Sequence, residues 1–352
     1  MLLWVALLAL LGGRVRGQDT SSSATCSAVL GELESSQCGA FCGTYEPCLV
    51  FDSSTDCSAT GCVSDADGLC QYTCADYLAF SFTMYIPFGS YQSDEEIAER
   101  ALDNESYEQS LDIWTSDYTD GYFVINDDLI TSFGSLQLNP YTTDVTIAGG
   151  TSTFGTTKGH VVNVSLEGSF LSNNTQVTSV SLVNMNLNTP FDVLPELLPS
   201  NLSTLELTNV LLYEFPADLA ALPALSSLTL TYNYLTFIDT VVGFDSLQIL
   251  YLSKNNLSEI PSVISEMPTI TDLDLSYNAI TSVDASFSSE SLTSLTISSN
   301  QISTFEASFP NLESLSISSN QLTEIPAVVF EFKKLSSLYV FTFARSIQFL
   351  FE

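Results

Sequence analysis

Residues 247–257 read LQILYLSKNNL, and the same pattern recurs as LSSLTLTYNYL at 225–235 and as ITDLDLSYNAI at 270–280. Apolar residues occupy the first, fourth, sixth and eleventh positions of each stretch, and Asn occupies the ninth. The alternation between the fourth and sixth positions is the period-2 pattern of a short strand that buries one face. The Asn amide can bond backbone groups where the chain leaves the strand, including those of the neighbouring coil.

Further copies of this unit start at residues 177, 202, 292 and 312, so that consecutive starts lie 20 to 25 residues apart. A weaker unit starts at Val161, and one that starts at Leu335 has Phe343 where Asn is expected. The units at 177 and 202 carry Asn one place early. Proline stands fourteen residues after three of the starts, at Pro216, Pro261 and Pro326. Proline in this register predicts a turn-rich return path instead of a full helix.

These motifs resemble the leucine-rich-repeat superfamily, whose L-x-x-L-x-L-x-x-N-x-L signature and period they share. The resemblance covers roughly Val161 to Leu338. It implies an α/β-type repeat solenoid, a right-handed coil with parallel strands on its concave face and irregular segments on its convex face. It also implies ligand recognition without catalysis and without a cofactor.

The remaining sequence divides into a leader, a cysteine-rich flank and two less regular parts. The apolar run from Leu2 to Leu11 and the small residues before Gln18 predict a signal peptide at 1–17, with a retained membrane anchor as the alternative. We expect a cysteine-rich module at 18–75, a cap or transition region at 76–159, leucine-rich repeats at 160–338 and an irregular apolar end at 339–352. No later uncharged apolar stretch reaches the roughly 18 residues of a membrane helix.

All cysteines lie in the flank, at Cys26, Cys38, Cys42, Cys48, Cys57, Cys62, Cys70 and Cys74. An even, dense set after a signal peptide predicts a disulfide framework, and its pairing stays open among 105 possibilities. A metal site is the rival interpretation. It is disfavoured because thiolate metal sites of this density belong to reducing compartments. Cys38 with Cys42 and Cys70 with Cys74 would each share a face if the segment were helical. N-glycosylation sequons occur at Asn104, Asn163, Asn173, Asn201 and Asn256.

Signal peptide, cysteine-rich flank and repeats together resemble the ectodomain of a receptor-like protein. The spacing in the flank and the scarcity of Lys most resemble the ectodomains of oomycete-type leucine-rich-repeat receptor-like kinases. No glycine-rich phosphate loop, H-R-D or D-F-G motif accompanies them, so the kinase is absent from this chain.

The charge narrows the possible partners. The 352 residues carry 8 Lys+Arg against 41 Asp+Glu, a net charge of −33. Nucleic acids and anionic membranes require basic patches, so the charge disfavours both as partners. His160 is the single histidine, so multi-His zinc sites are excluded. We interpret His160 itself as a structural side chain.

Two regions lack the repeat pattern. Ser93 and Glu96 form a capping box that predicts a helix to Leu102, and strands are predicted at 122–125 and 136–138. The end from residue 339 onward is apolar and aromatic. It is interpreted as a cap, or as an incomplete or mis-spliced product whose natural continuation holds more repeats and a membrane span that would place it at the cell surface. The second interpretation predicts association through an uncovered apolar coil.

The candidate binding residues lie on the outward face of the strands. Positions 2, 3, 5, 7 and 8 of each unit should point outward, and most of them are Ser or Thr. Three adjacent units differ, with Tyr232, Ile249, Tyr251, Lys254, Asp272, Asp274 and Tyr277. Tyr offers large contact area at low entropy cost, and Lys254 is placed to order the patch by cation–π contact or by pairing with Asp274. The alternative is a solvated face on which the tyrosines tile one another.

Two acidic motifs invite a metal interpretation. Asp272 and Asp274 could bind Ca²⁺ or act as a glycosidase pair, but no further ligands accompany them. Asp65-Ala66-Asp67-Gly68 resembles half a Ca²⁺ loop without the distal Glu, which favours a simple turn.

The sequence therefore predicts a secreted, non-enzymatic recognition module that binds an extracellular peptide, protein or glycan through its concave face. The alternative is a secreted hydrolase inhibitor that acts by steric occlusion, to which the acidic surface would steer a basic enzyme. A glycoside hydrolase is the least supported hypothesis.

Overall fold

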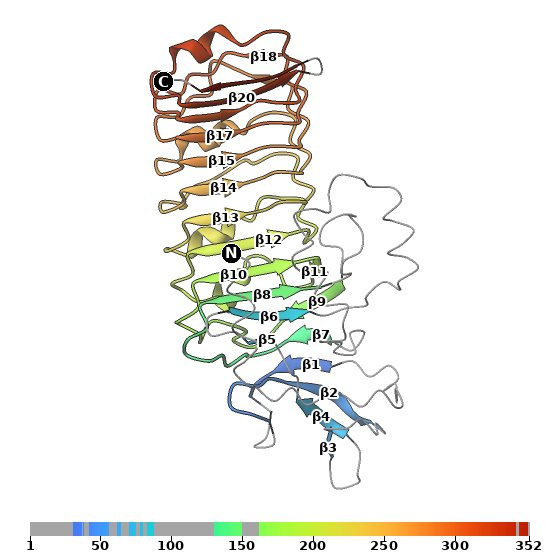
Figure 1. The fold of residues 1–352 in the computed structure, drawn as a ribbon. Coiled ribbons are helices and arrows are strands. Elements are labelled where there is room, and N and C mark those ends of the chain that lie inside the picture. Colours follow the sequence, from blue (N-terminus) through green and yellow to red (C-terminus); the bar gives the residue numbers. More distant parts are fainter. Residues whose placement is uncertain are drawn as a thin grey trace, which may run out of the picture.

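The computed structural model in Figure 1 describes residues 31–36, 38, 42–55, 62–64, 70–74, 78–79, 83–87, 130–149, 162–342 and 345–350. Several predictions fall outside these residues, namely the signal peptide at 1–17, the helix at 93–102, the strand at 122–125, the turn at Asp65–Gly68, His160 and the sequon Asn104.

Figure 1 shows a column of strands stacked one above another, with the flank at one end. Within the described residues these strands form a 12-stranded sheet in the order β21-β20-β19-β17-β15-β14-β13-β12-β10-β8-β6-β5. Every pairing from β6 to β20 is parallel. The strands are β5 (Leu78–Ala79), β6 (Thr83–Pro87), β8 (Asp144–Ala148), β10 (Ser179–Val183), β12 (Thr204–Thr208), β13 (Ser227–Thr229), β14 (Ile249–Tyr251), β15 (Asp272–Asp274), β17 (Ser294–Thr296), β19 (Ser314–Ser316), β20 (Ser337–Thr342) and β21 (Arg345–Leu350).

The repeat pattern explains the register of this sheet. The fourth residues of successive units pair directly, as Leu228 with Leu250 and Leu250 with Leu273. All three are 0% exposed, while the residues on either side of them point outward and are half-buried. Because a slip by one residue would turn every leucine to solvent, burial fixes the register. The outward side of the sheet is called the strand face below.

The ninth-position asparagines join the coils as the sequence predicts. The Asn255 Oδ1 atom accepts the Leu235 backbone N–H at 3.0 Å, and its Nδ2 donates to the Leu230 carbonyl at 2.9 Å. Both partners belong to the preceding coil. The same pair of bonds recurs at each of the next three units, at Asn278, Asn300 and Asn320. A ladder of buried and half-buried amides therefore satisfies backbone groups where these strands end.

The return segments are short, as the prolines predict. Pro216, Pro261 and Pro326 are the N-caps of three 3₁₀ helices, η3 (Ala217–Ala221), η4 (Ser262–Glu266) and η5 (Ala327–Glu331). One short helix, α4 (Leu194–Leu197), and a parallel pair, β16 (Ser282–Val283) with β18 (Thr304–Phe305), also lie on return segments. Beneath the last coils Phe309 packs against Phe287 at 5.6 Å and against Phe332 at 5.9 Å between ring centroids.

The first coils differ from the prediction. The strand predicted from Val161 is β9 (Val162–Leu166), but it pairs with β7 (Ile130–Phe133) and β11 (Met185–Leu187) in a second sheet. In the main sheet β10 lies between β12 and β8, so the parallel sheet reaches back before residue 160. In the unit that contains β8 the first position is Thr142, which is 3% exposed, and this polar residue hides the unit from a leucine pattern.

The predicted strand at 136–138 is wrong. Leu136 and Leu138 are both buried, yet the segment belongs to no strand. The Asn174 side chain takes the place of a partner strand, because its Oδ1 accepts the Leu138 N–H at 2.9 Å and its Nδ2 donates to the Leu136 carbonyl at 2.7 Å. An alternating apolar pattern cannot show that a side chain supplies these bonds.

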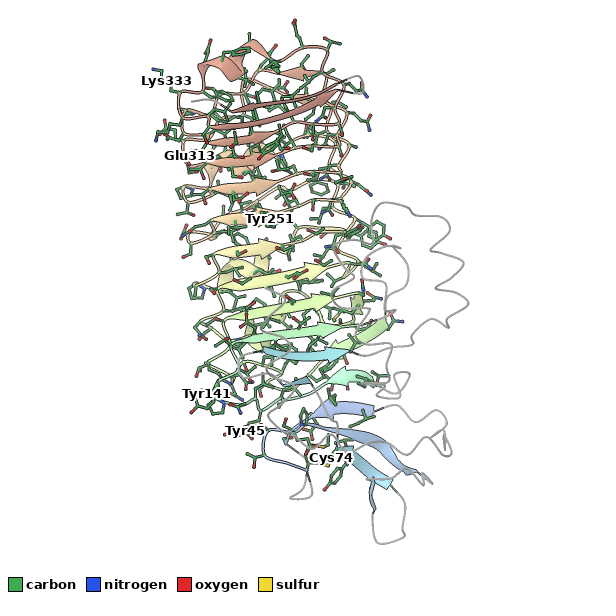
Figure 2. The ribbon with its side chains drawn as sticks, viewed as in Figure 1. Tyr45, Cys74, Tyr141, Tyr251, Glu313 and Lys333 are labelled. Carbon is green, nitrogen blue, oxygen red and sulfur yellow. A yellow bond between two sulfur atoms is a disulfide. The ribbon has the colours of Figure 1, made fainter. Side chains whose placement is uncertain are left out.

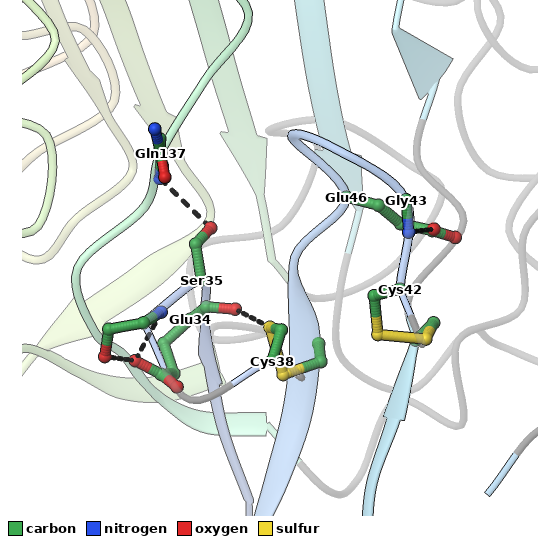
Figure 3. The surroundings of a disulfide bond; sticks show 10 residues. Glu34, Ser35, Cys38, Cys42, Gly43, Glu46 and Gln137 are labelled. Atoms are coloured by element: carbon green, nitrogen blue, oxygen red, sulfur yellow. Dashed lines mark hydrogen bonds between the residues drawn. A yellow bond between two sulfur atoms is a disulfide. The ribbon is translucent and has the colours of Figure 1, made fainter. Parts of the chain in front are cut away.

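The flank extends the second sheet. Its order is β11-β9-β7-β1-β2-β4-β3, with β1 (Gly31–Glu34), β2 (Cys48–Thr55), β3 (Cys62–Ser64) and β4 (Cys70–Cys74). β1 forms a parallel pair with β7 of the first coils and an antiparallel pair with β2 of the flank, so it joins the flank to the first coils. The Ser35 hydroxyl also accepts the Gln137 N–H at 3.0 Å (Figure 3).

Disulfides close this part of the flank. Cys38 is bonded to Cys48 and Cys42 to Cys74 (Figure 3). No described cysteine side chain is free. Cys70 and Cys74 lie on a strand, not on the helix that their spacing allowed. Cys26 and Cys57 fall outside the described residues, and the pairing of Cys62 and Cys70 stays a prediction.

The chain does not become irregular at residue 339. β20 continues to Thr342, and β21 returns antiparallel along it, with Ser337 opposite Leu350. In Figure 1 this hairpin forms the end of the sheet farthest from the flank. Among the described residues no helix approaches the length and apolarity of a membrane span.

Candidate recognition surface

The structure brings the seven predicted binding residues onto three adjacent strands and the turns that follow them. β13, β14 and β15 pair in sequence, and Figure 2 labels Tyr251 on β14, partway along the strand face. We call these seven residues the tyrosine patch. Its members fall into two groups, one around Lys254 and one around Asp272.

The first group is a stack with Lys254 between two rings. The Lys254 Nζ atom lies 3.9 Å from the ring centroid of Tyr232 and 5.4 Å from that of Tyr277. The ammonium also donates a hydrogen bond to the Tyr232 hydroxyl. These distances are those of cation–π contacts, so this contact, expected from the sequence, is present. Tyr277 is 51% exposed and forms the outer side of the stack.

The environment of the stack shifts two pKa values apart. Burial lowers the pKa of Lys254 to about 8, and burial with the neighbouring Tyr277 raises the pKa of Tyr232 to about 12. The ammonium therefore stays charged at neutral pH and the phenol stays neutral, which is the pairing that a cation–π contact requires.

The backbone explains why these side chains meet. In six units the eighth residue donates its N–H to the seventh carbonyl of the next coil, as Tyr232 does to Ser253 at 3.1 Å and Lys254 to Ser276 at 2.9 Å. It does so with a positive φ, which recurs at the eighth position of seven units, at Asn184, Asn209, Tyr232, Lys254, Tyr277, Ser299 and Ser319. Because the backbone conformation is the same in every coil, side chains of the eighth column leave in parallel and contact their neighbours.

The second group surrounds Asp272. The Tyr251 hydroxyl donates to Asp272 Oδ2 at 3.4 Å, and Ile249 lies opposite Asp272 in the register. Burial raises the pKa of Asp272, while hydrogen bonds from Ser294 and Tyr251 oppose the rise. Asp274 accepts the Ser276 N–H at 2.8 Å and the Ser276 hydroxyl at 2.5 Å. Neutral donors thus orient both carboxylates on the strand face.

The described side chains do not assemble a metal cluster at these aspartates. Their one group of three close ligand atoms is Glu34, Cys38 and Cys48, and its two sulfurs are joined to each other. The patch presents aromatic rings, one ammonium and two oriented carboxylates on a short-strand scaffold.

Sequence reasoning missed an aromatic pair beside the patch. The rings of Tyr213 and Tyr234 stack at 5.0 Å between centroids with an interplanar angle of 12°. Tyr234 follows Tyr232 by two residues, and Tyr213, which is 64% exposed, belongs to the preceding coil. These residues hold the tenth and twelfth positions of their units, which were not counted as outward. The sequence does indicate that the tenth position points outward, because this position is Asn, Ala or Gln in the next four units.

The four described sequon asparagines, Asn163, Asn173, Asn201 and Asn256, are all exposed. Three of them have hydrogen-bonded side chains. Asn163 accepts from Asn186 at 2.8 Å, Asn173 donates to the Ser169 hydroxyl at 2.9 Å, and Asn201 donates to the Thr175 carbonyl at 2.8 Å. Their glycosylation stays a prediction.

Comparison with known proteins agrees with this architecture. Residues 200–257 and 245–302 match the family model described as leucine rich repeat, and residues 311–332 match a second model of that description. The chain therefore carries a leucine-rich-repeat domain, with a long parallel sheet and a disulfide-bonded N-terminal flank. Domains of this class are generally protein-binding and typically non-catalytic.

Solved structures give more distant likenesses. A leucine-rich-repeat protein of Leptospira interrogans is 19% identical with a TM-score of 0.44, over 60% of this chain and 58% of that one. The APL1 leucine-rich repeat domain is 19% identical with a TM-score of 0.41, over 75% of this chain and 82% of that one. The chain thus spans less than two thirds of the Leptospira protein. A search of curated proteins found no match.

Proposed function

We propose that this chain is a secreted, receptor-like recognition module that binds an extracellular protein, peptide or glycan through the tyrosine patch. The observation that carries the proposal is the Tyr232–Lys254–Tyr277 stack, which gathers two aromatic rings and a charge on a face where most outward residues are Ser or Thr. Tyr is among the residues that dominate binding energy at protein interfaces, whereas Ser and Thr are under-represented among such residues.

The flank supports the extracellular part of the proposal. Two disulfides close its described portion, and such bonds form and persist in oxidising compartments. We expect export through the leader at 1–17, so that sequencing of the secreted protein should begin at Gln18. A secreted product that begins at Met1 would contradict cleavage of that leader.

The test of binding compares two double variants that alter the same backbone column. Tyr232→Ala with Tyr277→Ala removes both rings of the stack. Ser299→Ala with Ser319→Ala changes the eighth position of two neighbouring units, where φ is also positive, and leaves the patch intact. Each immobilised protein is exposed to extracellular fluid, and the partners retained by the wild type are identified by mass spectrometry.

We expect the tyrosine variant to lose a partner that the serine variant retains. Removal of an anchor aromatic typically costs about 2 kcal/mol or more of binding free energy, so the loss of each ring should weaken binding by about 30-fold. Urea unfolding of both variants is the control for folding. Equal retention by both folded variants would place the binding surface elsewhere.

A further inference from the structure

Asn256 lies beside the aromatic pair that borders the patch. The tenth residues of successive coils form a backbone ladder, in which Tyr234 donates to Leu212 at 2.8 Å and Asn256 donates to Leu235 at 2.9 Å. Neighbouring coils are about 4.8 Å apart in such a ladder. Asn256 is therefore one coil from Tyr234, whose ring stacks on Tyr213 in the coil beyond.

The local structure directs Asn256 outward. Asn255 before it is 6% exposed and bonds to the preceding coil, and Leu257 after it is 0% exposed. Asn256 itself is exposed, as is Ser258, which completes the sequon. Unlike Asn173 and Asn201, the Asn256 side chain makes no hydrogen bond to the described residues. A glycan attached here would displace no contact of the fold.

The Tyr213–Tyr234 stack offers a surface that sugars can cover. Tyr213 is 64% exposed, although its ring is ordered against Tyr234 at 5.0 Å. One apolar face of a pyranose carries C–H groups of positive polarity, which suit the negative face of an aromatic ring.

We propose that Asn256 carries an N-linked glycan whose innermost sugars pack against Tyr234 and Tyr213, covering this edge of the tyrosine patch and leaving the strand face open. The inference depends on passage through a secretory pathway, which is part of the proposed function, and does not depend on the binding of a partner. Its consequence is directional, because a bulky glycan on this edge restricts a partner to the strand side of Lys254.

The experiment uses a pair of matched sequon variants. The chain is secreted from insect cells behind a heterologous signal peptide, so that export does not rely on its own leader. Ser258→Ala removes the Asn256 sequon and keeps the asparagine. Thr175→Ala removes the Asn173 sequon in the same way, and the hydroxyls of Ser258 and Thr175 are both on exposed residues. Glycopeptide mass spectrometry measures occupancy at each sequon.

Hydroxyl-radical labelling then measures the accessibility of Tyr213. We expect Tyr213 to be labelled severalfold less in the wild type and in the Thr175→Ala variant than in the Ser258→Ala variant. Tyr141, which is 70% exposed and lies several coils from Tyr251 in Figure 2, should be labelled equally in all three proteins. An unoccupied Asn256 would overturn the proposal, and so would equal labelling of Tyr213 with and without the glycan.

A thermal measurement separates packing from mere shielding. If the sugars rest on the rings, Ser258→Ala should lower the melting temperature by about 1–3 °C in the wild type and by less in a Tyr213→Ser, Tyr234→Ser background. The same shift in both backgrounds would show that the glycan does not pack on the pair. Loss of partner capture in the preceding experiment would leave each of these readouts unchanged.

Discussion

Replacing Asn255 by Ala should destabilise the solenoid far more than replacing its neighbour Asn256. The Asn255 amide is 6% exposed and bonds the Leu235 N–H at 3.0 Å and the Leu230 carbonyl at 2.9 Å. Alanine removes the amide and leaves both backbone groups without that partner at a site closed to water.

The magnitude follows from those two groups. Each buried polar group left unsatisfied costs about 1–3 kcal/mol, so the variant, which leaves two such groups, should lose about 2–6 kcal/mol of unfolding free energy. Asn256→Ala removes an exposed amide of the same size and should change it by less than about 0.5 kcal/mol. For a repeat domain of this length, where 1 kcal/mol shifts the melting temperature by about 2–4 °C, the Asn255→Ala loss lowers the melting temperature by roughly 4–24 °C.

The assay is urea unfolding of unglycosylated protein with its disulfides intact, followed by circular dichroism. Because each coil contacts only its neighbours, the loss should be concentrated in the coils that flank residue 255, which hydrogen exchange of Leu235 and Leu257 would show. If Asn255→Ala and Asn256→Ala had equal midpoints, the amide ladder would not hold these coils together.

Three further outcomes are expected. The folded Lys254 has a pKa of about 8 against an ordinary 10.5, so between these pH values the unfolded state binds more protons and the stability of the protein should rise with pH. Lys254→Met should abolish this rise, as measured by urea unfolding midpoints. Midpoints that depend on pH in the same way in both proteins would contradict the prediction. The secreted protein should show no titratable thiol without denaturant. Because a disulfide that closes a longer loop stabilises more, opening Cys42–Cys74, with a separation of 32 residues, should destabilise the flank by about 3–4 kcal/mol. Opening Cys38–Cys48, with a separation of 10 residues, should destabilise it by about 2.7 kcal/mol. Ser299→Gly, at φ 55°, should leave the protein about 1 kcal/mol more stable than Ser294→Gly on β17, and the opposite order in urea would contradict the left-handed eighth position.

The sequence predicts the regular coils well because their columns report burial directly. Each structural requirement restricts one position of the repeat to one kind of residue. Leucine points inward, asparagine bonds two coils, and proline caps a 3₁₀ helix. The irregular coils escape this reasoning for local reasons. Thr142 replaces an apolar first residue, and Asn174 supplies bonds that a strand would otherwise make to Leu136 and Leu138.

The patch was predictable in membership and only partly in arrangement. Outward residues follow from strand alternation, so the seven side chains could be named. Which of them touch depends on the turn after each strand, whose positive φ no apolar pattern reveals. Sequence reasoning therefore offered Asp274 as one partner of Lys254, whereas Asp274 bonds Ser276 and Lys254 lies between two rings.

The same turn explains a departure that looked like a fault in the repeat. Asn184 and Asn209 stand at the eighth position, one place before the signature asparagine, and there they adopt φ values of 57° and 52°. Asn tolerates this left-handed conformation better than most residues, and the Asn209 amide also donates to Asn184 Oδ1 at 2.9 Å. In the next three units Tyr, Lys and Tyr adopt the same conformation, at a cost of roughly 1 kcal/mol each. Because later units meet the same backbone requirement with the small Ser299 and Ser319, the fold does not require large side chains in this column. The backbone conformation therefore does not account for the rings and the ammonium, which supports the proposal that they serve recognition.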